Sequence, residues 1–150
     1  MRRVILASSS PRRQELMARL GILYEVVPLP VEEEALEGES PQEMVVRLAL
    51  AKARAVHRLN PNDVILAADT TVFVDGKILG KPRDEAEARE MLLTLKGRTH
   101  LVFTGVAVLI PPSLELIRVK CSSVLMRDYS PEEVEAYVKS GRAMDKAGAY

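Results

Sequence analysis

The chain has 150 residues, of which 47% are hydrophobic and 28% charged, and its formal net charge is zero. This length suits one domain, and it allows about 70% of the surface of the unfolded chain to be buried. The apolar fraction excludes a disordered chain, and the balanced charge argues against a dedicated nucleic-acid binder. We therefore expect a globular protein with its own hydrophobic core and no nucleic-acid partner.

Cysteine usage and hydropathy indicate the cellular setting. Cys121 is the single cysteine, which excludes an intramolecular disulfide and a cysteine-rich zinc cluster. This usage fits a reducing compartment, so we expect a cytoplasmic location. No apolar run approaches the roughly 18 residues that a membrane span needs, so no membrane partner is expected. His57 and His100 each lack a second histidine at ligand spacing, which predicts ordinary surface or core histidines.

Short apolar runs alternate with segments of helical periodicity, which predicts an α/β fold. The predicted strands cover residues 4–7, 23–27, 64–68, 72–74, 77–79, 101–110, 114–119 and 123–126. The predicted helices cover residues 11–20, 41–57, 85–95 and 131–139. Loops are expected at 28–39, which is rich in proline and glutamate, and at 142–150.

Local signals indicate where several of these elements begin and end. Ser10 is the expected N-cap of the first helix, and Gly21 is expected to end it. The apolar face of that helix is expected to contain Leu16, Met17 and Leu20. Ser40 and Ser130 each open a capping box with proline at the first helical position. Asp75-Gly76 is a tight hairpin signal between two short strands.

Lys52 conflicts with the amphipathic pattern of the helix at 41–57. On a helical wheel it falls near the middle of an apolar arc formed by Met44, Val45, Leu48, Ala49, Ala51, Ala55 and Val56. Because burying an unpaired ammonium is costly, Lys52 needs a ligand, a buried carboxylate or a polar cavity around it. The alternative is a lysine whose ammonium reaches solvent past the edge of the helix.

Asp69 directly follows the apolar run 64–68, at the carboxyl end of a predicted central strand. Open α/β sheets bind ligands in the crevice beyond such strand ends. A carboxylate there can act as a general base or bind a metal. The alternative is a turn or helix cap, although no clear helix follows Asp69.

The segment Ser8-Ser9-Ser10-Pro11-Arg12-Arg13 connects the first strand to the first helix. The backbone N–H groups and the dipole at a helix N-terminus favour an anion such as phosphate. Arg12 and Arg13 are unfavourable for that dipole unless an anion offsets them, and arginine can bind phosphate through two hydrogen bonds. The alternatives are a plain capped helix with solvated arginines and a phosphorylation site at the Ser10-Pro11 step.

Lys81 and Glu33 are weaker candidates. Lys81 lies between Gly80 and Pro82, which can hold its backbone and aim its side chain, although an exposed loop lysine is the simpler alternative. Glu33 belongs to the run 32–34, which is most simply a solvated charge run. Magnesium, however, prefers one or two carboxylates together with the phosphate oxygens of a substrate.

Standard catalytic motifs are absent from the sequence. There is no G-x-x-x-x-G-K-[ST], G-x-G-x-x-G, H-E-x-x-H or G-x-S-x-G, which excludes a P-loop NTPase, a dinucleotide enzyme of the usual kind, a zincin and an α/β-hydrolase. What remains is a set of basic groups for phosphates, carboxylates for a metal, and one strand-end aspartate. This set suits metal-assisted attack of water on a phosphoryl group.

Short motifs along the whole chain resemble the Maf family. They are Ser8-x-Ser10-Pro11-Arg12-Arg13, Ala67-Ala68-Asp69-Thr70, Leu79-Gly80-Lys81-Pro82, Leu95-x-Gly97-x-x-His100 with Thr104-Gly105-Val106, and Asp145-Lys146-Ala147-Gly148-Ala149-Tyr150. They come in the order of the family, and their combination is highly specific.

This resemblance implies a nucleoside triphosphate pyrophosphatase that cleaves dTTP or UTP, and modified nucleotides, into the monophosphate and pyrophosphate. It also implies a divalent cation, Mg or Mn, and a homodimer. The implied fold is an α/β architecture of two lobes around an elongated mixed sheet, similar to the inosine triphosphatase family. Because the family was first described through inhibition of septum formation, the alternative is a nucleotide-binding regulator of cell division without catalysis.

The resemblance also assigns roles by position. Asp69 matches the general base, and a metal is expected at Asp69 and Glu33. The residues that match phosphate-binding positions are Ser8, Arg13, Lys52 and Lys81. Arg12 and Thr70 match positions that set the base preference, and they resemble the dTTP/UTP-preferring subfamily rather than the one that acts on 7-methyl-GTP.

The last motif, residues 145–150, looks interrupted. In the family the chain continues into a Gly-rich segment with a glutamine that is tied to base preference, and that glutamine has no counterpart in this sequence. We therefore expect a single Maf-like domain at residues 1–150 that lacks the C-terminal segment of the family, either because the protein ends early or because the sequence is truncated.

Overall fold

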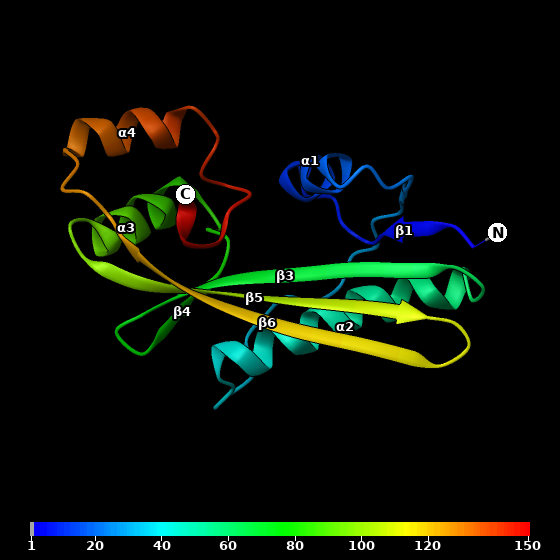
Figure 1. Ribbon diagram of the computed structural model, residues 1–150. Coiled ribbons are helices and arrows are strands. Elements are labelled where there is room, and N and C mark those ends of the chain that lie inside the picture. The colour runs from blue at the N-terminus through cyan, green and yellow to red at the C-terminus, as the bar shows by residue number, and fades with distance from the viewer. Residues whose placement is uncertain (1) are drawn as a thin grey trace. The chain divides into compact units, whose positions relative to one another are not determined.

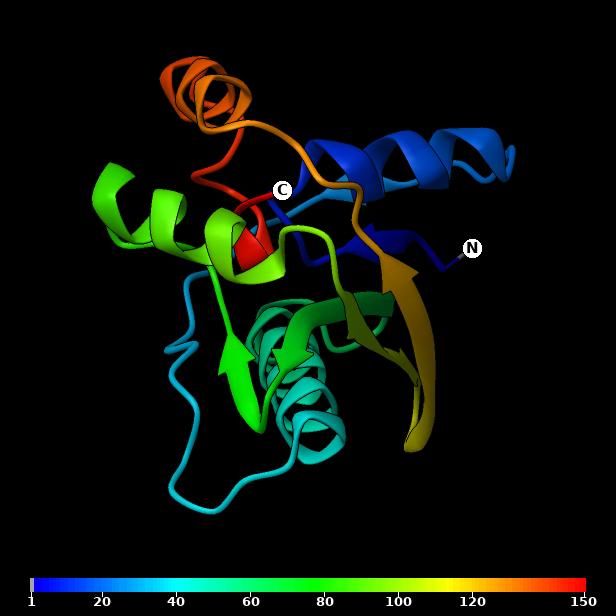
Figure 2. The same cartoon turned by 90° about the vertical axis from the view of Figure 1, so that its left-hand side faces the viewer.

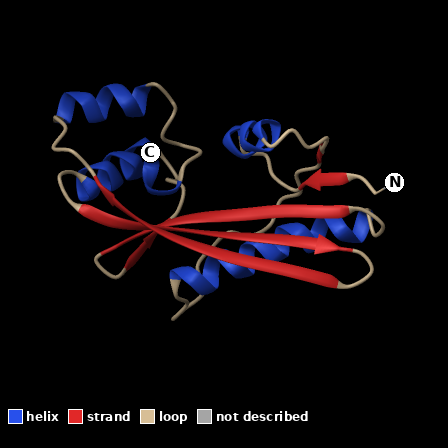
Figure 3. Ribbon diagram, in the orientation of Figure 1, coloured by secondary structure: helices blue, strands red, loops and turns tan. Residues whose placement is uncertain are grey.

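The fold is built on a β-sheet with helices beside it, and the computed structural model describes residues 2–150. Within these residues the strands are β1 (Val4–Leu6), β2 (Glu25–Val26), β3 (Val64–Val74), β4 (Lys77–Leu79), β5 (Thr99–Ile110) and β6 (Leu114–Leu125). The helices are α1 (Pro11–Arg19), α2 (Pro41–Leu59), α3 (Glu85–Leu95), α4 (Pro131–Lys139) and a short 3-10 helix, η1 (Ala147–Ala149). Figure 3 colours helices and strands separately. The expected α/β class is confirmed.

The sheet is mixed. Its strands follow the order β2-β1-β3-β5-β6, with β4 paired to β3. β1 runs parallel to both of its neighbours, and Ile5 pairs with Glu25 on one side and with Ile65 on the other. β4 is antiparallel to β3, because Asp75 and Gly76 form the expected hairpin turn with positive φ at both residues.

The chain forms two compact units. The first contains the chain up to Asp69 together with Thr104–Val119, and the second contains Thr70–Phe103 together with Lys120–Tyr150. The boundaries fall inside β3, β5 and β6, so each of these strands contributes residues to both units.

In the first unit, α1 and α2 lie on opposite faces of the sheet (Figures 1 and 2). The core beside α2 consists of Ile5, Ala7, Ala49, Ala53, Val56, Ile65, Ala67, Ala107 and Leu109. Gly105 of β5 lets α2 lie close to the sheet, because a Cβ atom at this position would lie 2.6 Å from the carbonyl oxygen of Val45 in α2. No side chain fits at this distance, so α2 packs directly on the backbone of β5.

In the second unit, α3 and α4 pack against each other (Figure 1). Their shared core includes Ala88, Met91, Leu92, Tyr129, Val134 and Val138. The hydroxyl of Tyr129 donates a hydrogen bond to the carbonyl of Leu92. A second cluster joins Val72 and Val74 of β3 to Leu95 of α3, and Tyr150 packs against it.

The helix caps agree with the sequence analysis. Ser10 Oγ accepts a hydrogen bond from the backbone N–H of Arg13, and Ser40 and Ser130 each form a complete capping box. The hydroxyl and carboxylate groups of these boxes satisfy N–H groups that have no partner within the helix.

Two pairs of predicted strands are single strands in the structure. The runs 64–68 and 72–74 both belong to β3, because Thr70 and Thr71 between them are β-prone and remain in the sheet. The runs 114–119 and 123–126 both belong to β6. β6 is the last strand in the order of the sheet, and most of its residues are exposed. Its backbone pairing therefore continues through a polar middle that shows no apolar pattern.

Two smaller expectations are also wrong. The expected loop at 142–150 contains η1. At the first helix only Met17 of the expected apolar face is buried, whereas Leu16 in α1 and its C-cap residue Leu20 are exposed.

Candidate active site

Lys52 lies between two carboxylates. Its Nζ donates a hydrogen bond to Asp69 Oδ1 at 2.9 Å and lies 2.9 Å from Glu33 Oε1. The side chains of Lys52 and Asp69 are 11% and 8% exposed, whereas that of Glu33 is 37% exposed. The ammonium of Lys52 therefore has carboxylate partners, and the alternative of a lysine that reaches solvent past the helix is wrong.

Strand alternation explains why Asp69 faces Lys52. Asp69 lies on the same face of β3 as Ile65 and Ala67, since alternate residues of a strand share a face, and both of these pack into the core beside α2. On α2, Lys52 follows Ala49 by one turn and precedes the buried Ala53. A polar pair thus continues the apolar contact between the strand and the helix.

Two details of the predicted geometry are corrected. Asp69 lies inside β3 rather than at the carboxyl end of a strand, because β3 continues to Val74. On α2, Ala53 is buried although the wheel did not place it in the apolar arc, whereas Ala51 and Ala55 are only half-buried. The sheet contacts α2 along a slightly different line from the one that the apolar residues alone indicate.

The electrostatics of Asp69 fit a base. Burial raises the pKa of the Asp69 carboxyl, Lys52 opposes this shift, and the negative charge of Glu33 adds to it. The pKa of Arg13 is lowered by burial, while the charges of Asp69 and Glu33 act to raise it. Arginine nevertheless remains protonated in proteins, so Arg13 adds a second cation to the charge cluster of the first unit.

The turn before α1 is tightly organised. Ser8 is buried, and its Oγ accepts a hydrogen bond from the backbone N–H of Ser10 at 3.1 Å. Ser10 in turn caps α1 through the N–H of Arg13. Arg13 is half-buried and Arg12 exposed. The turn thus presents a serine hydroxyl and two arginines from one short segment.

Thr70 and Lys81 belong to the second unit. Thr70 follows Asp69 in β3 and is half-buried. Lys81 is exposed in the loop between β4 and α3, between the half-buried Gly80 and the buried Pro82. The structure therefore brings Lys52, Asp69 and Glu33 into direct contact within the first unit and places Lys81 on a separate loop.

The donor atoms at this site suit a hard divalent cation. Two carboxylates, Asp69 and Glu33, approach the same ammonium nitrogen, and Mg²⁺ prefers one or two carboxylates together with substrate phosphates and water. Among residues 2–150 no group of three or more histidine, cysteine or acidic side chains is placed to hold a metal ion. Asp69 and Glu33 are the acidic side chains of this cluster that could hold such a cation.

His100 is a core histidine, one of the two alternatives, surface or core, that its isolation predicts. It is buried in β5, and its Nε2 forms a hydrogen bond with the hydroxyl of Tyr150. The two rings meet edge to face. No local pattern points to this pair, because fifty residues separate its two members.

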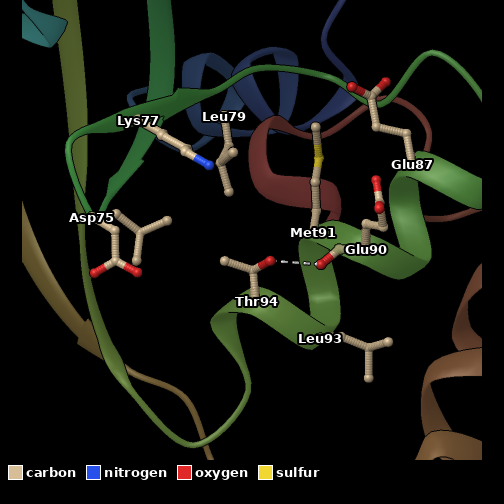
Figure 4. A pocket seen from close by; sticks show the side chains of 9 residues that line it. Asp75, Lys77, Leu79, Glu87, Glu90, Met91, Leu93 and Thr94 are labelled. Atoms are coloured by element: carbon tan, nitrogen blue, oxygen red, sulfur yellow. Dashed lines mark hydrogen bonds between the residues drawn. The ribbon is translucent and has the colours of Figure 1, made fainter.

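A cavity of about 530 Å³ lies in the second unit, beside the β3–β4 hairpin and α3 (Figure 4). It contains none of the predicted site residues. Two of its acidic side chains are paired, Asp75 with Arg98 and Glu87 with Arg83. Thr94 Oγ1 donates a hydrogen bond to the carbonyl of Glu90 within α3.

No helix within residues 2–150 combines the length and the apolar composition that crossing a membrane requires.

Comparison with known proteins matches both the sequence and the fold. The sequence profile of the family described as "Maf-like protein" matches residues 3–150. A dTTP/UTP pyrophosphatase of Symbiobacterium thermophilum is 51% identical over 150 residues, which is 100% of this chain and 77% of that protein. A protein of the same name from Dictyoglomus thermophilum is 48% identical over 98% of this chain and 77% of its own length. Another, from Bacillus cereus strain AH820, is 45% identical over 100% of this chain and 78% of its own length.

Two solved structures share the fold. A HAM1 protein from Coxiella burnetii superposes with a TM-score of 0.56 at 22% identity, covering 83% of this chain and 73% of that one. A nucleoside-triphosphatase described as a dITP/XTP pyrophosphatase, from Mycobacterium abscessus, gives a TM-score of 0.51 at 20% identity and covers 82% and 72%. With the family profile covering residues 3–150 and identities of up to 51% to these relatives, the chain belongs to the Maf family.

Proposed function

We propose that this chain is a nucleoside triphosphate pyrophosphatase that hydrolyses dTTP and UTP, and modified nucleotides, to the monophosphate and pyrophosphate. The observation that carries this proposal is the 51% identity, over the whole chain, to a relative named dTTP/UTP pyrophosphatase. The charge cluster of Lys52, Asp69 and Glu33 supplies groups that suit such a reaction.

Asp69 is the proposed general base. As the oxygen of a water molecule forms a bond to the α-phosphorus, Asp69 accepts a proton from that water. The bond from the α-phosphorus to the oxygen that bridges it to the β-phosphorus breaks, and pyrophosphate leaves with the electron pair. Burial, which raises the pKa of Asp69, makes the carboxylate a stronger base than an exposed aspartate.

Basic and hydroxyl groups are proposed to hold the phosphates. Lys52 and Arg13 supply positive charge in the first unit, where both act on Asp69. Ser8 can donate its hydroxyl proton while its Oγ accepts from Ser10. Lys81 is proposed to add a further charge to the departing pyrophosphate.

Arg12 and Thr70 are proposed to set the preference for the base. The exposed position of Arg12 on α1 and the half-buried position of Thr70 leave both side chains accessible. A panel of dTTP, UTP and 7-methyl-GTP tests this choice.

A divalent cation, Mg or Mn, is proposed to bind at Asp69 and Glu33. When bound, it would neutralise phosphate charge in the transition state. Lys52 already neutralises part of the charge of the two carboxylates, so a bound cation would share these acidic groups with the ammonium.

The decisive experiment is pyrophosphate release from dTTP and UTP with Mg²⁺ or Mn²⁺. We expect turnover by the wild-type chain and its loss in the variant Asp69→Asn. Nucleotide binding without turnover by the wild-type chain would instead support a regulator of cell division.

The family resemblance also leads us to propose a homodimer and a cytoplasmic location. Size-exclusion chromatography with light scattering tests the first, and cell fractionation tests the second.

A further inference from the structure

Both sides of Lys81 are constrained by the fold of the second unit. The peptide that joins Gly80 to Lys81 accepts a hydrogen bond at its carbonyl oxygen from the backbone N–H of Gly148, at 3.0 Å. After Lys81, Pro82 is buried, and a proline restricts the residue before it to extended conformations. The backbone of Lys81 is thus limited from its N-terminal and its C-terminal side.

Neighbouring hydrogen bonds hold the same loop at both ends. Thr71 Oγ1 donates to the carbonyl of Leu79 at 3.4 Å, just before the Gly80 peptide. The backbone N–H of Arg83 donates to Glu87 Oε2 at the start of α3. The hydrogen bond from Gly148 differs from these two, because Gly148 lies 68 residues after Gly80 in the chain.

Gly148 can occupy its place only as glycine. Its φ is +68°, in the left-handed region, and a Cβ atom there would lie 2.8 Å from Val72 Cγ2. The next residue, Ala149, is fully buried and also has a positive φ, of 66°. A non-glycine residue in this region costs free energy and persists only where its surroundings hold it.

Contacts of Tyr150 stabilise the left-handed conformation of Gly148 and Ala149. Its ring packs against the cluster of Val72, Val74 and Leu95, and its hydroxyl bonds Nε2 of the buried His100. The N–H of Ala149 also donates to the carbonyl of Lys146 at 3.0 Å. Residues 146–150 therefore form a rigid support whose hydrogen-bond donor, Gly148 N–H, points at the Gly80–Lys81 peptide.

We propose that Gly148, with Tyr150 and His100 as its anchor, is a positioning residue that fixes the backbone of Lys81 for phosphate binding. This inference rests on the proposed function, because it assigns Lys81 to substrate phosphate. Because the lysine side chain is flexible, a fixed backbone lowers the total disorder that phosphate binding by Lys81 must remove.

A double-mutant cycle on kcat/KM separates positioning from general stability. We expect Lys81→Ala to lower kcat/KM about 100-fold, in the range for loss of a single stabilising group. Gly148→Ala should lower it about tenfold in the wild-type background and not at all in the Lys81→Ala background. If Gly148→Ala has the same effect in both backgrounds, Gly148 acts independently of Lys81 and the proposal is overturned.

Control variants distinguish the proposed positioning effect from a general loss of stability. Gly141→Ala places a similar left-handed backbone strain, at φ +78°, in an exposed turn with no atom within 4 Å of the added Cβ and so without the Val72 contact, and it should leave kcat/KM within about twofold of wild type. Tyr150→Phe removes the bond to His100 and keeps the ring. It should lower kcat/KM several-fold, again only when Lys81 is present.

A measurement without turnover distinguishes this proposal from the proposed function. The ¹⁵N order parameter of the Lys81 amide should fall from about 0.85 towards 0.6 in Gly148→Ala and stay unchanged in Gly141→Ala. An unchanged order parameter in Gly148→Ala overturns the positioning role even if the enzyme is active. Conversely, absence of turnover in the wild-type chain refutes the proposed function and leaves this measurement valid.

Discussion

Lys52 Nζ lies 2.9 Å from Asp69 Oδ1, and this contact joins the middle of α2 to the interior of β3. Both side chains are about nine-tenths buried, so solvent and salt screen the pair far less than a surface pair. Glu33 adds a second carboxylate to the same ammonium. With Arg13 as a second cation, the two positive charges of the cluster balance its two carboxylates, so the proposed divalent metal would need substrate phosphates as further ligands.

Replacing Asp69 with asparagine should abolish most turnover while the protein stays folded. The amide cannot accept a proton from water, and general-base catalysis typically contributes about 10²–10⁴-fold. Pyrophosphate release measures the loss, and circular dichroism checks the fold. Asp63→Asn is the control, because Asp63 pairs with Arg3 in the same unit and is not proposed to act on substrate. Equal losses in the two variants would contradict the role of Asp69.

The pH profile should respond to Glu33. Asp69 must be ionised to accept a proton, so kcat/KM falls as the pH drops through the pKa of Asp69. Burial raises that pKa, and the charge of Glu33 raises it further, so the acid limb should lie above the range of an ordinary aspartate. Glu33→Gln removes a negative charge and should move this limb to lower pH.

The profile is measured as kcat/KM from about pH 4 to 9. Glu15→Gln is the control, since Glu15 pairs with Arg19 on the exposed side of α1. A limb that stays in place or moves to higher pH in Glu33→Gln would show that Glu33 does not act on the base.

Lys52→Met should destabilise the protein at neutral pH. The substitution leaves Asp69 and Glu33 facing each other without their shared cation, and breaking a buried pair costs about 3–5 kcal/mol. Because Glu33 is partly exposed, we expect the free energy of unfolding, measured with urea, to fall by about 3 kcal/mol, near the lower end of this range. Adding Asp69→Asn to Lys52→Met should restore part of this free energy.

Lys139→Met provides the comparison for Lys52→Met. Lys139 forms an exposed pair with Glu135 at 3.8 Å, and exposed pairs contribute about 0–1 kcal/mol. If Lys52→Met costs no more than Lys139→Met, the buried cluster has no structural importance, and any loss of turnover belongs to catalysis alone.

Chelation should stop pyrophosphate release, and Mg²⁺ or Mn²⁺ should restore it. Glu33→Gln should then raise the metal concentration needed for half-maximal activity by at least about tenfold, since one of two protein carboxylates is lost. Titrations of metal against activity give this value. Full activity in the presence of excess chelator would contradict the proposed metal dependence.

Much of the site could be predicted because its members violate a local pattern. Lys52 interrupts an apolar helix face, and Asp69 ends an apolar strand run, so each is conspicuous without knowledge of the other. The capping boxes at Ser40 and Ser130 could be predicted for the same reason, since every group in them lies within four residues.

The remaining features depend on distant parts of the chain. Glu33 comes from a loop without periodicity, so its contact with Lys52 has no local signal. The continuity of β6 reflects pairing with a neighbouring strand rather than its own apolar pattern. The left-handed pair Gly148 and Ala149 is held by Val72 and His100, which lie at least 48 residues earlier in the chain.

Gly105 determines how far α2 stands from the sheet. Since a Cβ atom there would lie 2.6 Å from the carbonyl oxygen of Val45, even one methyl group would act as a wedge under the helix. Lys52 lies two helical turns after Val45, so lifting α2 would draw its ammonium away from Asp69. The spacing of the two charges is thus set by a missing carbon atom on a third element, far from either charge in sequence.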